Sequence, residues 1–232
     1  MSQDQQLRVA MAGVGGFGAH RRQTMRQTGL FDIVAAFDYN RDALNRACEQ
    51  ESAAPAESYD QMLQRDDLDA VVISTGATSH AEYALEALDR GLPVFVEKPV
   101  CCTWNEIRDL MTKQSETGLA LHLGHTDPDS AGSIVTVTRQ LRADAVGDVV
   151  SVEATAAHSG GFHINPGDWR GDPEKNPGGM LFQCGVHKIH ELHHHFGPVT
   201  NVIAMTRKDV HETGTDDAAQ CLLRFESGLV AT

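Results

Sequence analysis

Short apolar runs alternate with amphipathic stretches over the first half of the chain. The runs contain Val, Ile, Leu, Phe and Ala with little internal polarity, which is typical of parallel strands covered by helices on both faces. The strands predicted in this way are residues 8–12, 33–37, 70–75, 93–97 and 119–123. Helices are predicted between them, most clearly at 80–90 and 104–117, each followed by a glycine. In the second of these helices, Trp104, Ile107, Leu110 and Met111 are expected to face inward.

The pattern changes after residue 125. A helix is predicted near 134–141, an alternating strand at 149–155, and a histidine-rich helix at 180–196 after a long Gly/Pro/Asn/Asp stretch. Further strands are predicted at 199–205 and 219–225, followed by a turn and an apolar end at 229–231. The fold class is therefore α/β: a doubly wound parallel sheet in residues 1–124, then an α+β domain with an open, mainly antiparallel sheet in residues 125–232.

Composition and charge narrow the function classes. The chain has 232 residues, of which 41% are hydrophobic and 22% charged, as in ordinary globular proteins. Its net charge of −13 would repel phosphate backbones and anionic lipids, which argues against nucleic acid and membrane partners. The N-terminus is polar and lacks the apolar segment of a signal peptide. The five cysteines lack metal-ligand spacing, and together these features favour a cytoplasmic protein with reduced thiols.

A glycine-rich turn follows the first predicted strand. Gly13, Gly15 and Gly18 form a G-x-G-x-x-G run that opens a helix, and Asp38 ends the second strand about 20 residues later. Such glycines let the backbone approach a pyrophosphate, while the helix N-terminus supplies unpaired N–H groups. A carboxylate at the position of Asp38 accepts hydrogen bonds from ribose hydroxyls and repels a 2′-phosphate, which favours NAD, although the nearby Arg41 leaves NADP open. We therefore predict a dinucleotide-binding Rossmann domain.

Two further strand ends carry candidate site residues. Ser74 and Thr75 end the third long strand and lead to His80, at the sheet edge where ligands of open α/β sheets bind. Glu97 and Lys98 end the fourth, where a lysine is well placed to hydrogen-bond a reacting oxygen. The predicted cofactor-binding residues are Gly13, Gly15, Gly16, Phe17, Gly18, Asp38, Ser74, Thr75, His80, Glu97 and Lys98.

Together with Glu97-Lys98-Pro99, these features resemble the Gfo/Idh/MocA oxidoreductases, relatives of glucose-fructose oxidoreductase and inositol dehydrogenase. The segment from Trp169-Arg170 to the helix around His187 also resembles that family's substrate domain. The resemblance implies hydride transfer between NAD(P) and a secondary alcohol of a sugar, cyclitol or related polyol. It implies that Lys98 contacts the substrate hydroxyl and that His187 is the general acid/base.

The resemblance also indicates the substrate side of the site. Gln183, Trp169, Arg170 and His163 are the candidate substrate-binding residues, with Gln183 at a position where many relatives carry Asp. An amide can orient a hydroxyl, but it cannot hold a charge as a carboxylate does. Relatives are usually longer, so the C-terminal domain is expected to be shortened or truncated. An uncovered sheet face suggests a homodimer or homotetramer.

Three alternatives stay open. A non-catalytic NAD(P)-binding sensor could use the same fold, and the glutamine at position 183 agrees with that reading. An NAD-dependent glycosidase would use transient oxidation on the same scaffold. A remote third alternative is a zinc metallopeptidase, because His190, Glu191 and His194 satisfy H-E-x-x-H, although no third ligand is evident and no metal is predicted.

Overall fold

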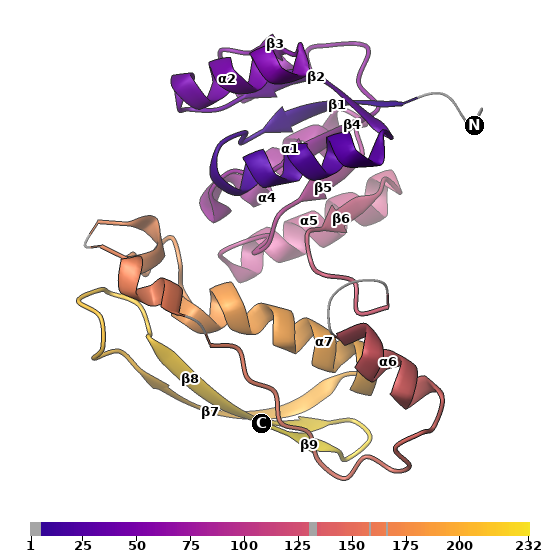
Figure 1. Ribbon diagram of the computed structural model, residues 1–232, viewed down its shortest axis with the longest axis vertical. Coiled ribbons are helices and arrows are strands. Elements are labelled where there is room, and N and C mark those ends of the chain that lie inside the picture. Colours follow the sequence, from indigo (N-terminus) through magenta and orange to yellow (C-terminus); the bar gives the residue numbers. More distant parts are fainter. Residues whose placement is uncertain (1–5, 130–133, 158, 166) are drawn as a thin grey trace. The chain divides into compact units, whose positions relative to one another are not determined.

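A computed structural model describes residues 6–129, 134–157, 159–165 and 167–232 (Figure 1). It divides the chain into two units, Met1–Gly124 and His125–Thr232. Within the described ranges, no helix combines the length and apolar character needed to cross a membrane.

The first unit contains a six-stranded parallel sheet in the order β3-β2-β1-β4-β5-β6. Its strands are β1 Leu7–Ala12, β2 Phe31–Phe37, β3 Ala54–Pro55, β4 Ala70–Ile73, β5 Val94–Val96 and β6 Leu121–Leu123. The parallel Rossmann sheet is thus confirmed. The two-residue strand β3 was not predicted, because so short an edge strand leaves no periodic pattern.

Helices cover both faces of this sheet. They are α1 Gly16–Thr28, α2 Arg41–Glu51, α3 Tyr59–Leu63, α4 Ala77–Asp89 and α5 Trp104–Thr117. In β1, Val9 and Met11 pack into one buried cluster with residues of α1 and α2. The alternate residues Ala10 and Ala12 pack into another with residues of α3, α4 and α5. Because successive strand residues point to opposite faces, the apolar run of β1 fills both layers.

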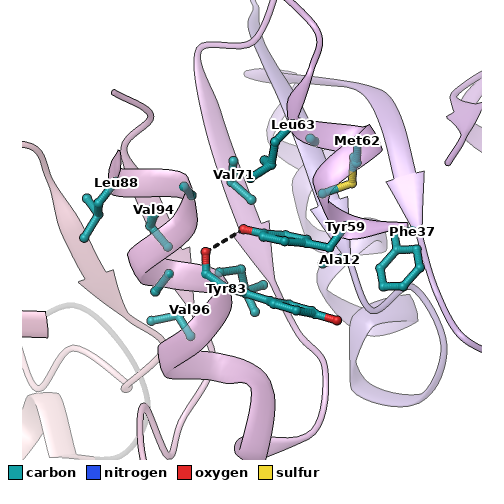
Figure 2. Packing of buried hydrophobic residues seen from close by; sticks show 14 of the residues in the cluster. Ala12, Phe37, Tyr59, Met62, Leu63, Val71, Tyr83, Leu88, Val94 and Val96 are labelled. Atoms are coloured by element: carbon teal, nitrogen blue, oxygen red, sulfur yellow. Dashed lines mark hydrogen bonds between the residues drawn. The ribbon is translucent and has the colours of Figure 1, made fainter. Parts of the chain in front are cut away.

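Figure 2 shows the second of these clusters, in which two tyrosines stack. The rings of Tyr59 and Tyr83 lie 3.9 Å apart and nearly parallel, and the Tyr59 hydroxyl donates to the Tyr83 carbonyl oxygen at 2.7 Å. Burial, followed by the charge of Glu86, raises the pKa of Tyr59. Its hydroxyl therefore stays protonated and acts as a donor that joins α3 to α4.

Helix α5 departs from its predicted orientation. Leu110 is buried as expected, but Trp104 is 84% exposed and Met111 is 66% exposed, so their inward assignment is wrong. Trp104 is the first residue of α5 and directly follows the N-cap residue Thr103, which forms a capping box with Glu106. The apolar side of this amphipathic helix is therefore narrower than the sequence pattern suggested, and its first turn points to solvent.

The second unit combines helical segments with a three-stranded antiparallel sheet. After α6 Ile134–Arg142 come two 3₁₀ turns, Ser159–His163 and Trp169–Gly171, a π-helical turn Leu181–Gly185, and α7 Val186–Phe196. The sheet is β7 Val199–Arg207, β8 Ala218–Phe225 and β9 Val230–Ala231, in that order. Leu192 of α7 packs with Leu223, Phe225 and Ala231 of the sheet, which agrees with the position of α7 along β7 and β8 in Figure 1.

The predicted strand at 149–155 is wrong. Only Val152 pairs with the sheet, in a single parallel bridge to Ala231. Three backbone hydrogen bonds join this segment to residues 230–232, and β9 itself has only two residues. An alternating sequence shows which side chains can face a core, but it does not provide a neighbouring strand to pair with. Because β9 is so short, the pairing of residues 149–155 with it ends after one bridge.

Candidate functional site

The glycine turn between β1 and α1 is shaped by close backbone packing. Gly13 has φ +81°, and a Cβ there would lie 2.5 Å from the carbonyl carbon and oxygen of Ser74. A Cβ at Gly18 would lie 2.1 Å from the Gly13 carbonyl oxygen. Because both neighbours are backbone atoms, neither position has room for a side chain. The turn thus lies directly against the backbone after β4, and the first turn of α1 packs closely on Gly13.

Asp38, at the end of β2, holds this turn in place. Its Oδ2 accepts hydrogen bonds from the backbone N–H groups of Val14 at 2.8 Å and Gly15 at 3.1 Å, and its Oδ1 accepts from Asn40 N–H at 2.8 Å. A carboxylate offers about four acceptor sites, so acceptor capacity is left for a further donor such as a ribose hydroxyl. Sequence spacing located Asp38 but gave no sign of its bonds to the turn.

A pocket of about 550 Å³ opens beside the glycine turn. Its lining includes the predicted residues Gly13, Gly15, Gly16, Asp38, Ser74 and Thr75, together with Ser79 and with Tyr39, Asn40 and Thr78, the last three of which were not predicted as cofactor contacts. Ser74 Oγ is buried here and has no hydrogen-bond partner among the described residues. The glycine turn lets a pyrophosphate come close to the backbone, and the Asp38 carboxylate and Ser74 Oγ can hydrogen-bond to ribose or phosphate groups. These features fit a dinucleotide.

Glu97 and Lys98 follow β5. Glu97 is 5% exposed, and its Oε1 accepts from Arg21 Nε of α1 at 2.9 Å. The Arg21 guanidinium also lies over the ring of Phe95, 4.7 Å from its centroid. Glu97 therefore anchors the strand end to α1, while the neighbouring Lys98 is half-buried and joined to Pro99 by a cis peptide bond. No motif in the sequence points to Arg21.

His80 lies inside the first unit. It is 2% exposed, with Nδ1 2.7 Å from the Pro99 carbonyl oxygen and Nε2 3.0 Å from the Thr75 carbonyl oxygen. Burial lowers the pKa of His80 against the opposing effect of these carbonyls. The side chain thus lies between the loop after β4 and the loop after β5, and as a neutral imidazole it donates to one of the two carbonyl oxygens.

In the second unit, the substrate-side candidates gather near the start of α7. A pocket of about 320 Å³ is lined by His163, Arg170 and Gln183, with Gly161, Ile164, Asp168 and Met180. Trp169 supports this group from outside the lining: the Arg170 guanidinium lies 4.4 Å from the centroid of its ring. The buried Asn176 donates from Nδ2 to the Arg170 carbonyl oxygen at 2.7 Å, which fixes the backbone at this position.

Gln183 and His187 occupy neighbouring turns of different helical type. Gln183 belongs to the π-helical turn Leu181–Gly185, and His187 is the second residue of α7. A Cβ at Gly185 would lie 2.5 Å from the Leu181 side-chain atom Cδ1, so the two residues pack closely across this turn. Wide turns of this kind often occur at functional sites, because they change the face on which side chains emerge. The sequence predicted a helix here but not the π-helical turn.

The residues of the H-E-x-x-H spacing have other partners. Glu191 Oε2 accepts from Lys188 Nζ at 2.6 Å, and His194 Nε2 lies 3.3 Å from Asp129 Oδ1. The imidazole of His190 stacks on that of His125, with ring centroids 4.7 Å apart. In the part of the chain that the structure describes, no group of three or more His, Cys, Asp or Glu side chains is arranged to hold a metal ion.

Comparison with known proteins identifies the family of both units. Residues 7–125 match the model of the Gfo/Idh/MocA oxidoreductase family, described as an NAD-binding Rossmann fold, and residues 134–232 match that of the Gfo/Idh/MocA C-terminal domain. Among curated proteins, a 4-carboxy-2-hydroxymuconate-6-semialdehyde dehydrogenase from Sphingobium is 23% identical over 97% of this chain and 70% of its own length. An inositol 2-dehydrogenase from Gluconacetobacter diazotrophicus is 29% identical over 64% of this chain.

The chain spans only part of the length of the relatives that it matches. It spans 45% of that inositol 2-dehydrogenase. Among solved structures, the WlbA dehydrogenase from Bordetella pertussis, in complex with NADH and UDP-GlcNAcA, is 23% identical with a TM-score of 0.86, over 98% of this chain and 68% of its own. The family models match most of the sequence, which confirms the resemblance drawn from its motifs. The chain belongs to the Gfo/Idh/MocA family of NAD(P)-dependent oxidoreductases.

Proposed function

We propose that this protein catalyses reversible hydride transfer between NAD and a secondary alcohol of a sugar, cyclitol or related polyol. The observation that carries the proposal is the pocket beside the glycine turn, where Asp38 and the buried Ser74 Oγ lie against backbone that tolerates no side chain. Gly13, Gly15 and the start of α1 would hold the pyrophosphate, and Asp38 would accept from the ribose. NADP is disfavoured because a 2′-phosphate would meet the Asp38 carboxylate.

Residues of this chain would accept the hydroxyl proton and stabilise the negative charge that develops on the alcohol oxygen. When bound, the nicotinamide accepts or returns the hydride. An alcohol gives up a hydride only as its hydroxyl proton is removed, and an imidazole has an ordinary pKa near the working pH. We assign this proton to His187, whereas the Lys98 ammonium would stabilise the negative charge that develops on the alcohol oxygen. Both assignments rest on the family motif.

The pocket near the start of α7 would orient the substrate. Arg170 supplies hydrogen-bond donors, Asp168 supplies acceptors, and the Gln183 amide supplies both, a mixture that suits neighbouring hydroxyl groups. Relatives named for inositol and for dTDP- and UDP-sugars agree with such a substrate class. Because Gln183 cannot ionise, we expect the pH dependence of turnover to differ from that of relatives with Asp at this position.

Self-association is part of the proposal. On one face of β7 and β8, Ile203, Met205 and Leu222 lie adjacent and are 67%, 78% and 43% exposed. Exposed apolar side chains on an open sheet commonly mark an interface. We therefore propose a homo-oligomer, which light scattering of the purified chain would test.

The proposed reaction is tested by following NADH absorbance with a panel of sugars, inositols and related polyols. Substrate-dependent NADH formation, absent from a Lys98→Ala and His187→Ala double variant, is the expected result. Tight NADH binding with no turnover of any polyol would instead support the non-catalytic sensor, for which Gln183 is the specific observation. Release of a free sugar without net NADH would indicate glycoside cleavage.

A further inference from the structure

We propose that His125 is a positioning residue for His187. It orients the His187 imidazole and couples the protonation of His187 to its own, within a cluster that also contains His190. The inference rests on the proposed function, since it concerns the residue to which proton transfer is assigned. It adds a residue that the motifs do not contain: His125 belongs to the loop after β6, far from α7 in the sequence.

The rings of the three histidines are in direct contact. The His125 ring meets that of His187 nearly edge-on, with centroids 5.6 Å apart and an interplanar angle of 79°. On its other side it stacks on His190, with centroids 4.7 Å apart and an angle of 22°. Each of the three side chains is half-buried. Edge-on and stacked rings at these separations attract one another, so His125 restricts rotation of the His187 ring about its χ2 bond.

The surrounding charges favour one neutral partner in this cluster. Burial, followed by the charge of His194, lowers the pKa of His190, and His193 adds to the effect. Glu191 on α7 and Asp127 on the loop oppose it, but the net effect is a lowered pKa. His190 is therefore neutral near pH 7 and offers His125 an uncharged ring on which to stack. His125 and His187 then compete for a proton, because two charged imidazoles in contact repel each other.

Two substitutions of His125 separate orientation from charge. His125→Phe keeps an aromatic ring against His187 but cannot take a proton, whereas His125→Ala removes both properties. His193→Ala is the matched control, because His193 lies on the same helix and is exposed. We expect His125→Ala to lower kcat about tenfold or more with NADH affinity unchanged, as for a misaligned catalytic group. His125→Phe should keep kcat within about threefold of wild type on its alkaline plateau.

The charge effect is read by NMR titration of the histidine side chains, with the His187 signal assigned from its loss in His187→Asn. Both His125 variants should move the His187 midpoint to higher pH, because a proton on His125 no longer repels one on His187. His193→Ala should leave it nearly unchanged, because His193 acts on His190, which is already neutral near pH 7.

This titration needs no substrate, so it tests the contact even if no polyol is turned over and the proposed reaction fails. An unchanged His187 midpoint in both His125 variants would overturn the coupling. Equal kcat in wild type and His125→Ala would overturn the positioning role. If His125→Ala fails to fold, His125→Phe decides the coupling alone.

Discussion

The two units bury their apolar residues in different ways. The first has a sheet with a buried cluster on each face, so that Met11 and Ala12 of one strand are both fully enclosed. In the second, the buried cluster lies on one side of the sheet and centres on Leu192, Leu223 and Phe225. Beside it, a hollow of about 470 Å³ is lined by residues of α7, β7 and β8. The first unit is thus packed from two sides and the second from one.

The difference extends to the candidate sites. In the first unit the pocket is defined by backbone: glycines that admit no Cβ, and a carboxylate bonded to two main-chain N–H groups. In the second unit the candidate residues depend on side-chain contacts, such as Arg170 on Trp169 and His187 against His125. Backbone-defined geometry suits a cofactor with a constant shape, whereas side-chain geometry can vary with the substrate.

The largest expected effect breaks the backbone-defined pocket. Gly13→Ala requires φ +81° and places Cβ 2.5 Å from the Ser74 carbonyl group, so we expect a loss of about 3 kcal/mol or more in the free energy of unfolding of the first unit. NADH binding should be lost as well. Gly29→Ala is the control, because its φ is +66° but no atom lies within 4 Å of the new Cβ; about 1 kcal/mol is expected there. Denaturant titration measures the stability of the two variants and calorimetry measures their NADH binding. Equal losses of stability in Gly13→Ala and Gly29→Ala would refute the steric argument.

Removing the proton-transfer groups should have the next largest effect. We expect Lys98→Ala and His187→Ala each to lower kcat by about 10²-fold or more, the range for losing a general acid/base or its electrostatic partner. NADH affinity should stay close to that of the wild type, because the pocket beside the glycine turn, to which we assign the dinucleotide, includes neither side chain. Steady-state kinetics and NADH titration separate the two. Unchanged turnover in both variants would remove the assigned roles.

The sequence predicts more of the first unit than of the second. Glycine spacing and the apolar runs around Gly13 and Asp38 predict the parallel sheet and its site edge, because these features are local in sequence and recur at fixed periods. Contacts between distant residues leave no such signal. The Arg21 to Glu97 pair, the stack of His125 on His190 and the single bridge at Val152 all depend on tertiary packing.

A smaller effect is expected on cofactor preference when the charge of Asp38 in the first unit is removed. Asp38→Asn keeps an oxygen that can accept from the Val14 and Gly15 N–H groups but removes the negative charge. We expect the ratio of NADPH to NADH affinity to rise about tenfold, equivalent to ~1.4 kcal/mol. Calorimetric titration with both dinucleotides measures the ratio. The same ratio in wild type and variant would mean that Asp38 does not face the ribose.

The smallest expected effect concerns pH. The pKa of His80 is lower in the folded unit than in the unfolded chain, so the unfolded chain binds the proton more readily. The stability that depends on neutral His80 is present above about pH 6.5 and is lost as the pH falls below it. His80→Asn should therefore unfold at a lower temperature at pH 7 but show a shallower loss of stability between about pH 7 and 5. Parallel slopes for the two proteins would contradict this role.

Calorimetric titration of the wild-type chain with NADH tests the central claim most directly. A single saturable site, lost in Gly13→Ala and retained in Gly29→Ala, is the result predicted for a dinucleotide held by the glycine turn. Absence of saturable binding of both NADH and NADPH to the folded wild-type protein would contradict it.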